Sequence, residues 1–183
     1  MISQKHKNLD AMIDIFDVTR DGFLTIDDFI LHADRTCADL RLEKGTPLWH
    51  TIHNALQTWW NYLQRETATP NGRIPNADCV AIMENGLVSN PLFLESTVVQ
   101  IARAVFCVLD VDNDNKIGET EYLQLYAASG LSVETAINAF RMIDSNGDGI
   151  IELDEFVAVV REAFTTTDPN SPGAWFFGAP ANG

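Results

Sequence analysis

Residues 144–155 read Asp-Ser-Asn-Gly-Asp-Gly-Ile-Ile-Glu-Leu-Asp-Glu, a spacing of oxygen-bearing side chains that suits a hard divalent cation. Oxygens fall at positions 1, 3, 5, 9 and 12, and Gly149 at position 6 permits the sharp bend that turns them inward. A Ca²⁺ ion takes roughly 6 to 8 such oxygens. The predicted ligands are Asp144, Asn146, Asp148, the carbonyl of Ile150, Glu152 or a water that it holds, and Glu155. The stretch therefore predicts a calcium loop.

A second copy of the pattern occupies residues 17–28. Its predicted ligands are Asp17, Thr19, Asp21, the carbonyl of Phe23, Thr25 and Asp28. Asp28 at position 12 is one methylene shorter than Glu, so closure with both oxygens requires the backbone to move inward. We expect Ca²⁺ to bind here and Mg²⁺ to compete, because the tighter geometry suits a six-coordinate ion. Thr25 followed by Asp28 also fits a helix capping box.

A third copy occupies residues 110–121. Its predicted ligands are Asp110, Asp112, Asp114, the carbonyl of Lys116 and Glu121. Position 6 is Asn115 in place of glycine, and Asn is the side chain that best tolerates the positive φ of the bend. Gly118 at position 9 leaves that ligand to water, so the loop is predicted to bind calcium with four carboxylates.

The loop at residues 67–78 keeps the turn glycine but offers one carboxylate and places Arg73 among the ligand positions. We expect no calcium there. Position 8 of each loop can pair with its partner loop in a short antiparallel bridge, and this predicts two contacts, Leu24 with Ile74 and Ile117 with Ile151. The degenerate loop is therefore predicted to support its active partner.

Apolar residues recur at helical spacing before and after every loop. This predicts an all-α fold of four helix-loop-helix units in two pairs, with short β-bridges between paired loops, in one compact globule. One pair is expected at residues 1–88 and the other at 92–164. Between them, Asn90 and Pro91 resemble a linker that feeds the next helix. In the first pair, Gly45 ends a helix and Thr46-Pro47 begins another.

Residues 165–183 form a tail of different composition. A stretch rich in Thr, Pro and Gly leads to Trp175-Phe176-Phe177-Gly178. Adjacent large aromatic side chains at a polar chain end are poorly soluble when exposed, so we expect them to fold back into an apolar cleft. A tail that binds a partner is the alternative. Trp59 and Trp60 are expected to pack in the core.

The composition limits the partners. With 26 acidic and 12 basic residues the net charge is −14, which disfavours nucleic acid and anionic membranes and favours cations. No long apolar stretch occurs, and we expect a cytoplasmic, soluble monomer. Cys37, Cys79 and Cys107 are widely spaced among apolar residues and are expected to be buried free thiols.

Over residues 8–164 the chain resembles the EF-hand superfamily. Within it, Asp28, the long connections around the degenerate loop and the ending Pro-Gly-Ala-Trp-Phe-Phe-Gly resemble the sarcoplasmic calcium-binding proteins and calerythrin. The resemblance implies two EF-hand pairs packed face to face, Ca²⁺ in the loops at 17–28, 110–121 and 144–155, a buffering role and a tail that contributes to the core. Coelenterazine-binding proteins and calcium-triggered photoproteins share this architecture. However, all four histidines lie in the first third of the chain, which argues against photoprotein chemistry.

Three functions remain open. A calcium buffer is favoured because a sensor presents a flexible groove rich in Met, whereas the chain has only Met12, Met83 and Met142 beyond its first residue. A sensor that exposes an apolar site for a partner protein is the alternative, and a carrier of an apolar small ligand is a third function. An enzyme is not expected, because no phosphate-binding glycine loop, nucleophile elbow or zinc-protease motif is present.

Overall fold

The computed structural model describes residues 3–67, 72–90, 92–128 and 133–176. These residues form eight α-helices and four short strands, which confirms the predicted all-α class with β-bridges. In chain order the elements are α1 (Gln4–Phe16), β1 (Phe23–Thr25), α2 (Ile26–Asp39), α3 (Pro47–Glu66), β2 (Arg73–Pro75), α4 (Asn76–Ser89), a π-helical turn (Leu94–Val98), α5 (Val99–Leu109), β3 (Lys116–Gly118), α6 (Glu119–Ala128), α7 (Val133–Ile143), β4 (Ile150–Glu152), α8 (Leu153–Thr165) and a 3₁₀ turn (Pro172–Trp175).

The strands pair in the predicted register. Antiparallel β1 and β2 place Leu24 opposite Ile74, and antiparallel β3 and β4 place Ile117 opposite Ile151. All four side chains have no exposed surface. Each bridge therefore joins two loops through a pair of side chains that also belong to the core.

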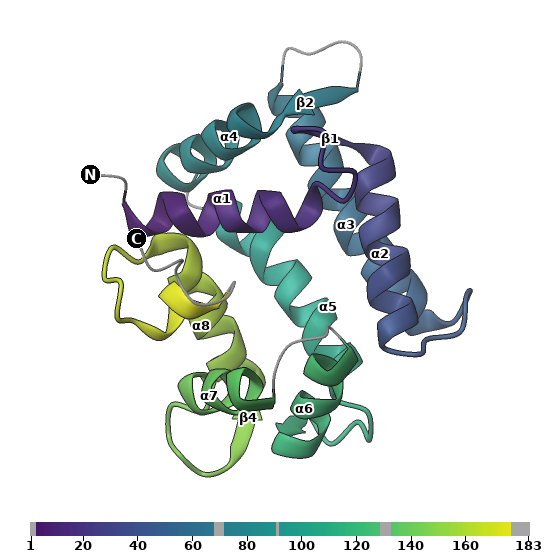
Figure 1. Ribbon diagram of the computed structural model, residues 1–183, viewed down its shortest axis with the longest axis vertical. Helices are drawn as coiled ribbons and strands as arrows, with labels where there is room; N and C mark the ends of the chain where they lie inside the picture. The colour runs from purple at the N-terminus through teal and green to yellow at the C-terminus, as the bar shows by residue number, and fades with distance from the viewer. Residues whose placement is uncertain (1–2, 68–71, 91, 129–132, 177–183) are drawn as a thin grey trace.

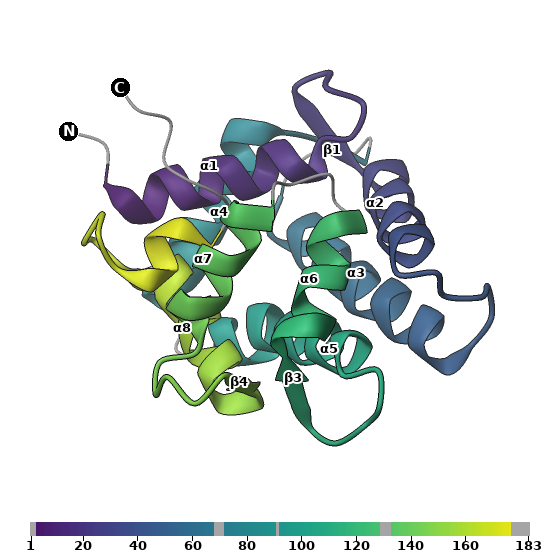
Figure 2. The ribbon, with the colours of Figure 1, turned by 60° about the horizontal axis from the view of Figure 1, so that its bottom comes forward.

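The two strand pairs lie at opposite ends of the molecule (Figures 1 and 2). Helix α1 crosses the middle, between α4 and α8 (Figure 1). Helices α2 and α3 run side by side, and α5 packs against both α3 and α8. Because α1 and α5 connect the two ends, the loops are carried on one continuous framework.

Local sequence explains where several helices begin. Thr46 caps α3 by accepting a hydrogen bond from the Trp49 amide, and Pro47 is the first residue of that helix, as predicted. At α2, the Thr25 amide donates to Asp28 Oδ2 at 3.0 Å, which confirms the capping box. After Asn90 the chain forms a π-helical turn before α5, a feature that residue spacing did not predict.

Aromatic side chains fill the core beneath the first loop. Trp59 stands edge-on to Phe16 and to Phe29, with ring centroids 4.6 and 5.3 Å apart. Trp59 and Trp60 are both buried, which confirms their predicted packing in the core. Edge-to-face arrangements of this kind stabilise a core beyond the area that they bury.

A cavity of about 110 Å³ remains near the centre of the core. Every residue that lines it is apolar: Met12, Phe16, Trp59, Met83, Val98, Ile101, Ala102, Val105, Phe156, Val160, Phe164 and Phe176. The cavity thus lies between helices of both loop pairs and the end of the described chain.

The 3₁₀ turn after α8 packs against α8, α7 and α1. Phe176 is half-buried and lies edge-on to Phe156, with ring centroids 6.1 Å apart. Asn8 of α1 binds this region, because its amide nitrogen donates to the carbonyls of Ala163 and Gly173 at 2.7 and 3.1 Å. The side chain of Trp175 and residues 177–183 lie outside the described part of the chain, so the predictions for Phe177 and Gly178 have no structural outcome here.

The cysteine prediction was wrong at one position. Cys37 and Cys79 are buried free thiols, whereas Cys107 is a free thiol exposed on α5. Its neighbours Phe106 and Val108 are buried, so the apolar face of α5 is set by them and Cys107 falls outside it. Among the described helices, none is both long enough and apolar enough to cross a membrane.

Candidate metal centres

The loop at 144–155 holds its first and last carboxylates with its own backbone amides. Asp144 Oδ1 accepts from the amides of Gly147 and Asp148, and Oδ2 accepts from Gly149 at 2.9 Å. Glu155 Oε1 accepts from the amide and the hydroxyl of Ser145 at 3.1 and 2.9 Å. The carboxylates that begin and end the loop are therefore oriented by the loop itself.

The remaining predicted ligands of this loop continue the pattern. Asn146 Oδ1 accepts from the Asp148 amide at 2.8 Å, and Asp148 Oδ1 accepts from the Ile150 amide at 3.0 Å. Glu152 begins the turn into α8, and its amide donates to Glu155 Oε2 at 3.1 Å. Each short side chain thus bonds to an amide two residues later, which curls the backbone around a central point.

The loop at 110–121 repeats this arrangement. The two oxygens of Asp110 accept from the amides of Asp114 and Asn115, each at 3.0 Å. The two oxygens of Glu121 accept from the amides of Val111 and Gly118 at 3.0 and 2.9 Å.

One carboxylate oxygen from each of Asp110, Asp112 and Asp114 lies within 4.8 Å of the other two. Lys116, whose carbonyl is a predicted ligand, begins β3. A cluster of hard oxygens suits Ca²⁺ or Mg²⁺ better than a soft transition metal.

The loop at 17–28 is closed by Asp28. Its Oδ1 accepts from the amide and the hydroxyl of Thr19 at 3.2 and 3.1 Å, and its Oδ2 accepts from the hydroxyl of Thr25 at 2.8 Å. Asp28 has 1% of its surface exposed, so it spans the loop in spite of its short side chain. Phe23, whose carbonyl is a predicted ligand, begins β1.

Residues from the degenerate loop also reach the loop at 17–28. Arg73 Nη2 lies 2.9 Å from Asp21 Oδ2, and Asn76 Nδ2 donates to Asp17 Oδ2 at 2.9 Å. The sequence analysis used Arg73 only to exclude calcium from the loop at 67–78, and it assigned no role to Asn76. A signal was available, because the predicted pairing of Leu24 with Ile74 places Arg73 next to the first loop.

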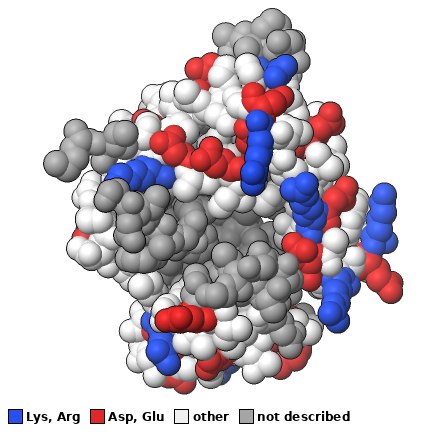
Figure 3. Space-filling view, viewed as in Figure 1, with Lys and Arg blue, Asp and Glu red and all other residues white. Residues whose placement is uncertain are grey.

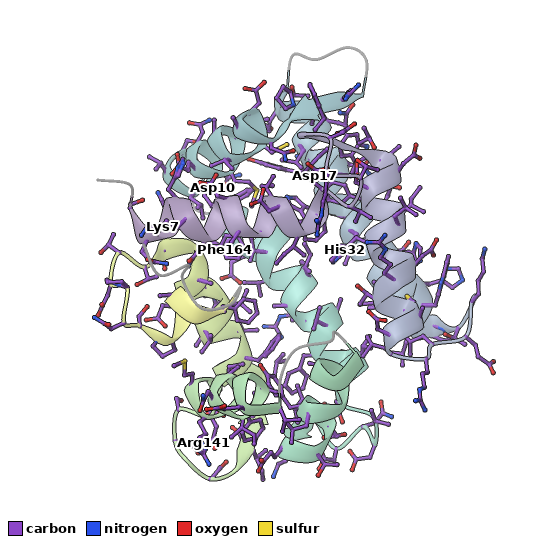
Figure 4. All side chains as sticks on the ribbon, viewed as in Figure 1. Lys7, Asp10, Asp17, His32, Arg141 and Phe164 are labelled. Carbon is purple, nitrogen blue, oxygen red and sulfur yellow. The ribbon has the colours of Figure 1, made fainter. Side chains whose placement is uncertain are left out.

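Burial and hydrogen bonding act in opposite directions on the pKa of Asp17. Burial acts to raise the pKa of Asp17. Hydrogen bonds from the Asn76 side chain and from the amides of Gly22, Asp21 and Arg20 outweigh this effect, and the pKa is lowered. The carboxyl group is therefore held in the charged form that binds cations. Figure 4 shows Asp17 at the end of the molecule that carries β1.

Positive φ angles occur at positions 4 and 6 of each of the three predicted calcium loops. The residues are Arg20 and Gly22, Asn113 and Asn115, and Gly147 and Gly149. Asn115 has φ 64°, as predicted for position 6, and position 4 was not predicted. These conformations turn successive amides toward the first carboxylate of each loop.

Comparison with known proteins agrees with this geometry. Residues 99–161 match the family of the EF-hand domain pair. The chain is 24% identical to calerythrin of Saccharopolyspora erythraea over 156 residues, which is 84% of this chain and 88% of calerythrin. A stretch of 80 residues is 32% identical to phosphatidylserine decarboxylase proenzyme 2 of Oryza sativa subsp. japonica, covering 41% of this chain and 13% of that protein.

Solved structures show the same fold. A Streptomyces coelicolor calcium-binding protein superposes with a TM-score of 0.70 at 19% identity, over 97% of this chain and 99% of the other. Okadaic acid binding protein 2.1 superposes with a TM-score of 0.76 at 17% identity, over 98% of both chains. The family match assigns an EF-hand pair to residues 99–161, and the solved structures share the fold of nearly the whole chain. The predicted resemblance to the EF-hand superfamily, and within it to calerythrin, is confirmed.

Proposed function

We propose that this protein binds three Ca²⁺ ions, in the loops at 17–28, 110–121 and 144–155, and that it buffers calcium in the cytoplasm. The observation that carries the proposal is that the amides of each loop orient the carboxylates at positions 1 and 12 toward the same point. Little rearrangement is then needed when an ion arrives, so little of the binding free energy is spent on ordering the loop.

Each loop offers oxygen atoms alone. In the loop at 17–28 the proposed ligands are Asp17, Thr19, Asp21, the Phe23 carbonyl, Thr25 and Asp28. In the loop at 110–121 they are Asp110, Asp112, Asp114, the Lys116 carbonyl and Glu121. In the loop at 144–155 they are Asp144, Asn146, Asp148, the Ile150 carbonyl, Glu152 and Glu155. When bound, the ion supplies two positive charges that offset the mutual repulsion of these carboxylates. Mg²⁺ is proposed to compete at 17–28, where the closing residue is Asp28.

A buffering role is supported by the close packing of the tail against α8, which covers part of the apolar core. Phe176 packs on Phe156, and a Cβ atom on Gly173 would lie 2.5 Å from the backbone of α8, so the tail lies in close contact with that helix. Calcium sensors expose an apolar groove when they bind the ion, whereas buffers barely open.

Calorimetric titration of the chelator-treated protein with Ca²⁺ tests the stoichiometry. Three ions per chain are expected. Four ions would contradict the exclusion of the loop at 67–78, and two would show that Asp28 or Asn115 disables its loop. A titration without heat or saturation would refute calcium binding altogether.

The sensor is the second candidate, and the observation in its favour is that the tail covers the edge of the apolar cavity through Phe176. Binding of an apolar dye with and without Ca²⁺ separates the two functions. For a buffer, dye fluorescence stays low or falls when Ca²⁺ is added. A large rise would establish the sensor.

Gly173→Ala is the matched positive control for that experiment. A methyl group at this position collides with the backbone at Ala163 and Glu162, so the tail cannot dock and the dye should bind without calcium. Asn170→Ala, at an exposed position three residues earlier, should leave the fluorescence unchanged.

A carrier of an apolar small ligand is a weaker candidate on grounds of volume. The cavity of about 110 Å³ is smaller than the ~300 to 1,000 Å³ of sites for drug-sized molecules. It is nearer the size that holds benzene or xenon. A ligand of the size of okadaic acid would therefore require the tail or a helix to move.

A further inference from the structure

The degenerate loop places a cation directly on a proposed ligand of the first loop. Antiparallel pairing sets Arg73 opposite Thr25, and the side chains of Leu24 and Ile74 enter the core. Because side chains alternate along a strand, Arg73 emerges on the other side, with its guanidinium carbon 3.9 Å from the ring centre of Phe23. From there Nη2 reaches Asp21 Oδ2 at 2.9 Å.

Both oxygens of Asp21 are thereby engaged, since Oδ1 accepts from the Phe23 amide at 3.0 Å. The cation–π contact with Phe23 holds the guanidinium over the loop and limits its freedom to swing into solvent. A second contact comes from Asn76. Its side-chain nitrogen donates a hydrogen bond to Asp17 Oδ2, and its backbone amide donates one to the Gly22 carbonyl. The degenerate loop thus restrains positions 1 and 5 of the first loop.

The other two proposed calcium loops differ in this respect. Among the described residues, no Lys, Arg or His forms an ion pair with a ligand carboxylate of the loops at 110–121 and 144–155. Each of those loops offers four carboxylates, whereas the first loop offers three and has Arg73 against one of them. The affinity of an EF-hand loop rises with the charge of its ligands, so the first loop has the weakest field for a cation.

We propose that Arg73 lowers the calcium affinity of the loop at 17–28, in addition to the effect of its smaller number of carboxylates. Its guanidinium group is already paired with Asp21, and an arriving Ca²⁺ ion has to displace this group or bind beside it. This inference rests on the proposed calcium binding and deepens it. It also gives the degenerate loop a specific task, since a loop that binds no ion carries the group that adjusts its partner.

The variant Arg73→Gln removes the charge and keeps most of the side chain. We expect the first loop to bind Ca²⁺ about 3- to 10-fold more tightly in this variant, because the partly exposed positive charge that pairs with Asp21 and repels Ca²⁺ is lost. Arg73→Lys keeps the charge and should remain within about 2-fold of the unaltered protein. If Arg73→Lys behaved as Arg73→Gln does, the charge account would be overturned.

Arg161→Gln is the matched control. Arg161 pairs with Glu95 away from every loop, and its side chain is 43% exposed, close to the 46% of Arg73. Both substitutions change the net charge by the same amount. Arg161→Gln should therefore leave the affinity of all three loops unchanged, and a tightening equal to that of Arg73→Gln would reduce the effect to overall charge and overturn the proposal.

Nuclear magnetic resonance in calcium-buffered solutions reads the loops separately in the full chain. The Gly22 amide, bonded to Asp17, reports the first loop, and the Gly149 amide, bonded to Asp144, reports the loop at 144–155. In Arg73→Gln the midpoint at Gly22 should shift to lower Ca²⁺ while the midpoint at Gly149 moves less than about 2-fold.

An unshifted midpoint at Gly22 in Arg73→Gln overturns the inference and leaves calcium binding intact. If Gly22 responds to Ca²⁺ in neither protein, both the inference and the proposed binding at the first loop fail. A difference between Arg73→Gln and the unaltered protein that shrinks when potassium chloride is raised would support the electrostatic origin. A difference independent of salt would contradict it.

Discussion

At the scale of single residues, each predicted calcium loop has positive φ at two positions, whereas the sequence pattern indicated one. Position 6 was predicted from Gly22, Asn115 and Gly149, because these residues favour or tolerate positive φ. Position 4 escaped prediction, since Arg20, with φ 57°, has no preference for that region. There the loop imposes the conformation by directing its amides at the first carboxylate, a requirement that spacing in the sequence does not express.

Glu155 is the residue on which the loop at 144–155 depends most. Glu155→Gln should weaken calcium binding there about tenfold or more, because it removes a charge in direct contact with the ion. Titration calorimetry measures the loss. Asp154→Asn, one residue earlier and exposed, removes the same charge outside the proposed ligands and should change the affinity by less than about 2-fold. Equal effects of the two variants would contradict the ligand assignment.

His32 makes the fold sensitive to acid. Burial, with a smaller contribution from the nearby Arg35, lowers the pKa of His32 to about 4 from an ordinary 6.5. Figure 4 shows His32 on α2. The centroid of its ring lies 4.1 Å from the ring centroid of Phe16. Between pH 6.5 and 4 the unfolded chain binds a proton that the folded chain excludes, so stability is retained above pH 6.5 and declines as the pH falls.

The expected loss from His32 is on the order of 3 kcal/mol at pH 4. Urea unfolding in the presence of a chelator measures it as the difference between the unaltered protein and His32→Phe, which lacks the titrating group. The two should diverge as the pH falls below 6.5. His50→Gln, at an exposed position, should follow the unaltered protein. Parallel curves for His32→Phe and the unaltered protein would rule out this role.

At the scale of elements, the strand bridges were the most predictable part of the fold. Pairing at position 8 follows from two loops of equal length packed as a pair, and it fixed Leu24 with Ile74 and Ile117 with Ile151. The π-helical turn at Leu94–Val98 was not predictable, because its sequence also suits an ordinary helix. Its neighbour Phe93 is fully buried and packs on Tyr62, so tertiary packing accompanies the extra residue in the turn.

The bridge between Ile117 and Ile151 should couple the two loops that it joins. Ile151→Ala removes a fully buried side chain and is expected to cost about 2 to 5 kcal/mol of unfolding free energy. It should also reduce the cooperativity of calcium binding between the loops at 110–121 and 144–155. Thermal unfolding and calorimetric titration measure the two effects.

Val111→Ala, whose side chain is 66% exposed in the same loop pair, is the control and should alter neither quantity measurably. Cooperativity that survived in Ile151→Ala would show that the loops communicate through their helices and not through the strand bridge.

At the scale of the whole molecule, the net charge is −14. On the face shown in Figure 3, acidic side chains occur from top to bottom, whereas Lys and Arg gather mainly on the right, over α2 and the turn after it. The local concentration of acid in the loops was evident from the sequence. The ion pair of Arg73 with Asp21 joins side chains 52 positions apart, and the only signal for it was the predicted pairing of Leu24 with Ile74, which places Arg73 next to the first loop.

Salt and calcium should therefore both stabilise the protein by reducing the repulsion between its acidic side chains. Three Ca²⁺ ions add six positive charges and bring the net charge from −14 to −8. Raising potassium chloride from about 20 to 500 mM should increase the melting temperature more in chelator than in excess Ca²⁺, because screening relieves repulsion that bound ions have already reduced. Differential scanning calorimetry in the four conditions measures this. Equal increases would mean that the ions bind away from the acidic loops.

The amide of Asn8 has a consequence for how the chain is made. Its two carbonyl partners lie 155 and 165 positions later, in the final helix and the turn that follows it. A ribosome delivers the chain from its first residue onward, so α1 emerges long before the surfaces that it will join exist. Until then Asn8, which is buried in the folded protein, is exposed to water. The closing contact between the beginning and the end of the chain is therefore a late event of biosynthesis, and a chain halted before Ala163 lacks both carbonyls that hold its first helix to the last.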